Sequence, residues 1–174
     1  MTHLHIHLLG PFEASLNSEP VTGFHSDKVR ALLAYLCVET EGAHRREKLA
    51  GFLWPDFPES VARTNLRSAL SNLRKVIGDR PQSGNAQSLA NFLCITRQTI
   101  QFNPDSEAWV DAHTFVKNLE AVHPTIAELE AGVACYRGEF MAGFSVPDTT
   151  IFEEWLLFQR ELFERLILKA LHTL

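Results

Sequence analysis

The chain has 174 residues, of which 45% are apolar, 10% aromatic and 21% charged, a composition that excludes a wholly disordered protein. Its longest apolar run, from Ala31 to Val38, is too short to cross a bilayer. The net charge of −5 is unevenly distributed, since residues 1–104 carry 11 basic and 9 acidic side chains whereas residues 105–174 carry 5 and 12. This asymmetry predicts two domains with different partners.

The first 25 residues have the pattern of short strands. His3, His5 and His7 alternate with apolar residues, a period of two that predicts a strand with one solvated face. Such a strand also offers imidazoles to zinc, as a zinc hydrolase requires, but no other histidines stand at a spacing that completes a site. We therefore expect a solvated sheet face, with no metal, no cofactor and no catalytic residue.

The cysteines and the N-terminus bear on location. Cys37, Cys94 and Cys135 are odd in number and far apart, so they form neither a disulfide framework nor a CxxC metal pair. The first ten residues have no basic residue ahead of the apolar ones and no small-residue cleavage site, so we predict no signal peptide. These features favour a cytoplasmic protein with reduced, mostly buried thiols.

Three helices are predicted between residues 26 and 78. The first is capped by Ser26, the second runs from about Arg45 to Leu53, and the third runs from about Glu59 to Ile77. A narrow apolar stripe on the third helix faces the core, while polar side chains project away from it beside a flank of arginines. The polar residues are Thr64, Ser68, Ser71, Asn72 and Lys75, and the arginines are Arg63, Arg67 and Arg74.

The sequence after the third helix predicts a polar loop over residues 79–90 and then a hairpin from Phe92 to Phe102, with Arg97 near its tip. Pro104 marks the expected boundary between domain 1–104 and a helical domain 105–174. In the second domain, Thr125 and Thr150 each begin a capping-box pattern, and Trp155, Phe158, Leu162 and Leu166 mark one apolar face of the last helix. That helix ends without a cap, so we expect the helical domain to be incomplete.

Several stretches together resemble a known family. HLLGPFEASLNSEPV, SDKVRALLAYL, REKLAGFLWPD and ARTNLRSALSNLRKVIG, in this order, resemble the OmpR-like DNA-binding domain of the antibiotic-regulatory-protein (SARP) family. WVDAHTF, YRGEFMAGFSVPD and FEEWLLFQRELFERL resemble that family's bacterial transcriptional activation domain. The resemblance implies an α+β fold, in which a winged helix-turn-helix with an N-terminal strand platform precedes an all-α tetratricopeptide-like domain.

The function implied by this resemblance is sequence-specific DNA binding that activates transcription. Double-stranded DNA is the expected partner, RNA polymerase and a second copy of the chain are further candidates, and no membrane is involved. An interaction scaffold whose winged helix does not bind DNA is the alternative, which the acidic second half keeps open. The family pattern differs at Ala69 and Asn72, where many members have His and Arg, and this puts the target sequence in doubt.

The third helix would enter the major groove, where polar side chains distinguish base edges. Lys75 is expected to donate to guanine and Asn72 to pair with adenine, while Thr64, Ser68 and Ser71 supply further polar contacts. The arginines of the flank, Arg63, Arg67 and Arg74, are expected at phosphates. By resemblance, Arg97 would reach the adjacent minor groove. Arg45, Arg46 and Lys48 are further candidates for backbone contact.

Overall fold

The computed structural model describes residues 2–79 and 92–174. Except for Asp79, the polar loop predicted over residues 79–90 lies outside the described residues. The chain begins with a sheet in the order β3-β2-β1-β7, made of β1 (Leu4–His7), β2 (Glu13–Leu16), β3 (Glu19–Pro20) and β7 (Trp109–Val110). Its β1 strand buries Leu4 and Ile6 and exposes His5, as the period of two predicts.

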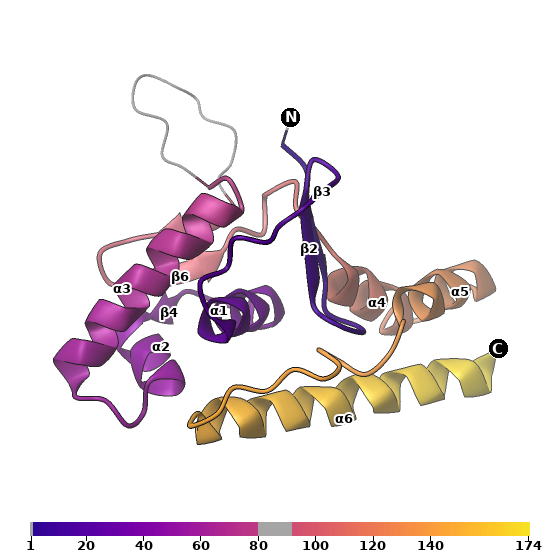
Figure 1. Ribbon diagram of the computed structural model, residues 1–174. Coiled ribbons are helices and arrows are strands. Elements are labelled where there is room, and N and C mark those ends of the chain that lie inside the picture. The colour runs from indigo at the N-terminus through magenta and orange to yellow at the C-terminus, as the bar shows by residue number, and fades with distance from the viewer. Residues whose placement is uncertain (1, 80–91) are drawn as a thin grey trace.

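A winged helix-turn-helix follows this platform (Figure 1). Its helices are α1 (Asp27–Val38), α2 (Arg46–Leu53) and α3 (Glu59–Val76). Its second sheet has the order β4-β6-β5, made of β4 (His44–Arg45), β6 (Thr99–Phe102) and β5 (Leu93–Ile95). Gly78 follows α3 with a φ of +74°, a left-handed conformation that suits glycine and ends the helix as predicted.

The rest of the chain is mainly helical, in α4 (Asp111–Leu119), α5 (Ile126–Cys135) and α6 (Thr150–Thr173). The capping box predicted at Thr125 is present, because Thr125 and Glu128 bond each other's backbone N–H groups. The box predicted at Thr150 is wrong. The N-cap residue is Thr149 and not Thr150, which is already the first residue of the helix. The carboxylate of Glu153 accepts a hydrogen bond from the backbone N–H of Val146.

Helix α6 buries the predicted face only in part, since Trp155 and Leu166 pack partly buried against the core while the centre of the buried face lies beside them. Phe158 is 59% exposed, whereas the buried face is formed by residues spaced three or four apart. These residues are Phe152, Leu156, Gln159, Phe163, Ile167 and Ala170. The helix contacts both α2 and α5 and runs along one side of the molecule past both halves (Figure 1). Tyr35 and Trp155 bring the halves together, with ring centroids 5.2 Å apart.

The two halves share one hydrophobic core. The β7 strand lies beyond the predicted boundary at residue 104 and pairs in parallel with β1. Directly after it, the fully buried carboxylate of Asp111 accepts hydrogen bonds from the backbone N–H groups of Leu8, at 2.8 Å, and Leu9, at 3.0 Å. The division into domains 1–104 and 105–174 therefore stays a prediction about independent folding, since these contacts join the two parts.

Candidate nucleic-acid interface

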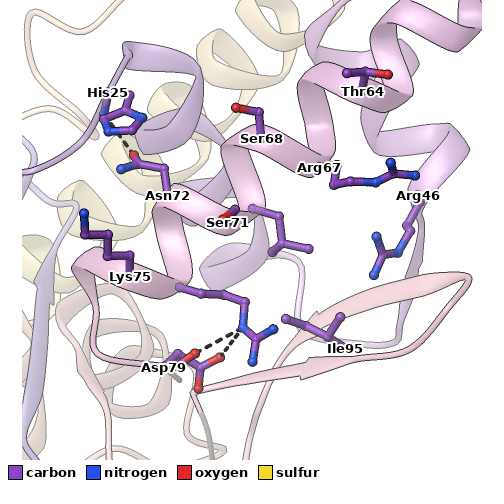
Figure 2. Close-up of a pocket in the computed structure, with 12 residues that line it drawn as sticks. His25, Arg46, Thr64, Arg67, Ser68, Ser71, Asn72, Lys75, Asp79 and Ile95 are labelled. Carbon is purple, nitrogen blue, oxygen red and sulfur yellow. Dashed lines mark hydrogen bonds and ion pairs between the residues drawn. The ribbon is translucent and has the colours of Figure 1, made fainter. Parts of the chain in front are cut away.

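The outward face of α3 borders an open groove of about 980 Å³ that extends to the wing, the β5–β6 hairpin (Figure 2). The helix packs Leu66, Leu70 and Leu73 into the core, as its apolar stripe predicts. From Arg63 onward its exposed side chains are polar or basic, namely Arg63, Thr64, Arg67, Ser68, Ser71 and Lys75, whereas the first turn exposes Glu59 and Val61. These six positions agree with the predicted outward face, and all except Arg63 line the groove.

Asn72 does not lie on the outward face, and the predicted placement of this residue is wrong. Asn72 is buried, with only 4% of its surface exposed. The amide Nδ2 donates to the carbonyl of Gly23 at 3.0 Å, and Oδ1 accepts from the backbone N–H of His25 at 2.9 Å. Both hydrogen-bonding ends are thus engaged within the protein, although Asn72 borders the groove, so its base contact stays a prediction that requires these bonds to open.

The arginines of α3 differ in the number of ion pairs and hydrogen bonds that they form within the protein. Arg63 forms ion pairs with Glu47, at 3.1 Å, and with Glu59, at 2.6 Å, so its charge is neutralised locally. Arg67 is exposed and has no hydrogen bond or ion pair to any described residue. It lines both the large groove and a smaller hollow of about 250 Å³ below the wing. Arg67 is therefore the flank arginine most available to an incoming phosphate.

Arg74 is half-buried and tied to the end of its own helix. Its Nε donates to the carbonyl of Asp79 at 3.1 Å and lies 3.5 Å from the Oδ2 of the same residue (Figure 2). The Asp79 carboxylate also accepts from the N–H of Phe92 at 2.8 Å, which fixes the entry into the wing. Burial raises the pKa of Asp79, and the hydrogen bond from Phe92 and the pairing with Arg74 counteract this only in part.

The wing is fixed to the start of α2 by Arg46. Its guanidinium Nε and NH2 both donate to the carbonyl of Thr96, at 3.2 and 2.8 Å, and its backbone N–H donates to Gln98. Arg97, between Thr96 and Gln98, is exposed at the hairpin tip and lines the smaller hollow with Arg67. The sequence predicts Arg46 only as a contact to the DNA backbone and does not predict that it holds the wing. No local pattern reveals it, because the bond spans 50 residues.

The histidine strand has a packing role. The ring centroids of His5 and His7 lie 5.6 and 5.1 Å from that of Trp109, and His7 Nδ1 lies 3.7 Å from Asp111. Within residues 2–79 and 92–174, no group of three or more His, Cys, Asp or Glu side chains is placed to hold a metal ion. In the same part of the chain, no helix is long and apolar enough to span a bilayer.

The cysteines match the expected thiol chemistry only in part. Burial raises the pKa of the Cys37 thiol well above its ordinary value, and it raises that of Cys135 as well. Cys94, on the wing strand β5, is exposed, contrary to the expectation that the thiols are mostly buried. All three are free.

The sequence was compared with known protein families and with characterised proteins. The chain matches no family model. Over 71 residues it is 37% identical to the transcriptional regulatory protein EmbR of Mycobacterium tuberculosis and of Mycobacterium bovis. The chain is similar to a transcriptional regulator. That alignment covers 41% of this chain but only 18% of the relative, so the likeness concerns a fraction of EmbR.

The solved structure of M. tuberculosis EmbR in complex with a low affinity phosphopeptide extends the likeness along the chain. It matches 98% of this chain with a TM-score of 0.68, at 24% sequence identity. The match covers 46% of that protein, so this chain spans less than half of its length. The agreement supports the winged helix followed by a helical segment as a shared fold.

Proposed function

We propose that this chain is a sequence-specific, double-stranded DNA-binding regulator of transcription that acts as an activator, without enzymatic activity. The observation that carries the proposal is the exposed face of α3 from Arg63 to Lys75, which is polar and basic and borders a groove that continues to the wing. A helix of this kind fits the major groove of B-DNA, with a hairpin beside it at the neighbouring backbone. The likeness to EmbR, named as a transcriptional regulatory protein, supports the same role.

The exposed residues divide into two roles in this proposal. Lys75 donates to guanine, and the hydroxyls of Thr64, Ser68 and Ser71 bond to base edges. Arg67 binds phosphate, and further basic groups extend the contact with the DNA backbone. These are Arg63, once DNA competes with its carboxylates, and Arg74 at the C-terminal end of α3. Arg97 enters the adjacent minor groove from the wing.

The helical segment is proposed to contact a protein partner, either RNA polymerase or a second copy of the chain. Helix α6 exposes several large apolar side chains, a feature typical of interaction surfaces. They include Leu157, Phe158, Leu168 and Leu171, each more than half exposed. Together with the acidic charge of residues 105–174, this surface also favours a second candidate function, an interaction scaffold that does not bind DNA.

Selection of bound sites from random duplexes, followed by salt titration on the selected site, tests the proposal. The logarithm of the binding constant should fall linearly with the logarithm of salt concentration, and Arg67→Ala should reduce the slope by about one unit. Arg165→Ala is the matched control, since Arg165 is an exposed arginine on α6 with no partner among the described residues. Absence of salt-dependent binding by the wild type refutes DNA binding and leaves the scaffold.

A further inference from the structure

The segment Gly23–His25 lies against the flank of α3 and is held there by Asn72. Asn72 donates to the carbonyl of Gly23 at 3.0 Å and accepts from the N–H of His25 at 2.9 Å, so both ends of the segment are attached to the helix. The approach is close, because a Cβ added at Gly23 would lie 2.9 Å from Cγ1 of Val76. The segment is therefore fitted to α3 along its length, although 47 residues separate His25 from Asn72.

Packing of the middle residue determines where His25 points. Phe24 is buried, with its ring centroid 5.6 Å from that of Phe12 and the Arg30 guanidinium over its face at 5.0 Å. Because Phe24 faces the core, the following side chain faces solvent. His25 is exposed and lines the same groove as Ser68 and Lys75.

His25 and the wing lie on opposite sides of α3. Figure 2 shows His25 beside Asn72 on one flank of the helix, with Ile95 of the wing and Arg67 on the other. A helix in the major groove has a sugar-phosphate strand on each side, about 12 Å apart across the groove. Arg67 provides a donor on the wing side of α3, and His25 lies on the opposite side, which faces the second strand when the helix enters the groove.

We propose that His25 is a DNA contact that donates to a phosphate on the strand opposite the wing, and that Asn72 is the residue that positions it. The inference rests on the proposed DNA-binding function. An imidazole N–H is a suitable donor to phosphate oxygen. The neighbouring carboxylate, Asp27, is already paired with Arg30 at 3.0 Å, which lessens its repulsion of the DNA. The contact fixes the position of α3 in the groove and carries no base information.

The test measures binding of the full chain to the selected duplex and to random duplex. His25→Ala should weaken binding to both by the same factor, about 3- to 10-fold, the contribution of one hydrogen bond. His3→Ala is the matched control, because His3 is an exposed histidine beside β1 whose hydrogen bonds to described residues, both with Asn17, use only its backbone N–H and carbonyl. It should bind both duplexes as the wild type does.

A double-mutant cycle tests the positioning role of Asn72. Asn72→Ala should weaken binding in the wild type, and it should weaken binding much less in the His25→Ala background, because the side chain it positions is already gone. A purely structural role for Asn72 gives additive losses, which would overturn the positioning claim. Binding is measured at a temperature where each variant is folded by circular dichroism.

The outcomes separate this inference from the proposed function. If the wild type binds no duplex, both fail. If the wild type binds and Arg67→Ala lowers the salt slope while His25→Ala equals the wild type, the His25 contact alone is refuted. A His25→Ala variant that changes base preference without weakening binding to random duplex also overturns it, since a phosphate contact is independent of sequence.

Discussion

Replacing Asn72 with alanine is expected to lower the free energy of unfolding by about 2 kcal/mol, from the loss of two hydrogen bonds between elements. The Gly23 carbonyl and the His25 N–H lose their partner. An unsatisfied buried group costs about 1–3 kcal/mol, and the lower end applies because both bonds are only part-buried and water reaches the vacated groups. Two such groups give the total. For a chain of this length, the expected fall in melting temperature is roughly 4–8 °C.

Thermal and urea unfolding followed by circular dichroism measure this effect. The control is Ser71→Ala, the adjacent residue on α3, which is exposed and should change stability by no more than about 0.5 kcal/mol. If Asn72→Ala and Ser71→Ala unfold at the same midpoint, the Asn72 amide is free in solution. The original sequence-based expectation of a base contact would then return.

Two buried carboxylates give further predictions. Asp111→Ala should destabilise the fold by about 4 kcal/mol in urea unfolding, because the buried N–H groups of Leu8 and Leu9 lose their acceptor; a loss below 1 kcal/mol would contradict this. Burial holds the pKa of Asp79 above its unfolded value of 3.8, so the folded state keeps a proton that the unfolded state has lost. The free energy of unfolding of the wild type relative to that of Asp79→Asn should therefore be greatest below pH 3.8 and fall as the pH rises from there through the pKa of folded Asp79. A difference that stays constant across pH would refute the raised pKa.

Local patterns in the sequence predict much of the fold because the forces behind them act over a few residues. The alternation in β1, the apolar stripe of α3, the left-handed Gly78 and the Thr125 capping box each depend on neighbours within one turn or one strand. The same holds for the exposed side of α3, since a helical wheel identifies which residues oppose the stripe. These features are the ones that the structure confirms.

Contacts between distant segments explain the errors. Asn72 lies away from the apolar stripe, and only the arrival of Gly23–His25 covers it. Helix α6 carries apolar residues on several faces, so its buried side is decided by what packs there, with Phe163 stacked on Phe140 at 5.1 Å. The two-residue strand β7 is too short for a periodic pattern and is stabilised by its pairing with β1.

The side-chain hydrogen bonds that hold α3 and the wing in place limit how this interface would recognise DNA. Asn72, Arg74 and Arg46 are polar residues near the groove, yet each bonds a backbone group of the protein and so holds the helix or the wing in place. The base-reading groups that remain on α3 are Lys75 and the hydroxyls of Ser68, Ser71 and Thr64, although the Thr64 hydroxyl already donates to the carbonyl of Ser60 at 3.0 Å. Hydroxyls both donate and accept and therefore discriminate weakly between base pairs, whereas a lysine opposite guanine is selective. Specificity at this interface would then depend on Lys75 and on the deformability of the DNA held between the wing and the opposite flank.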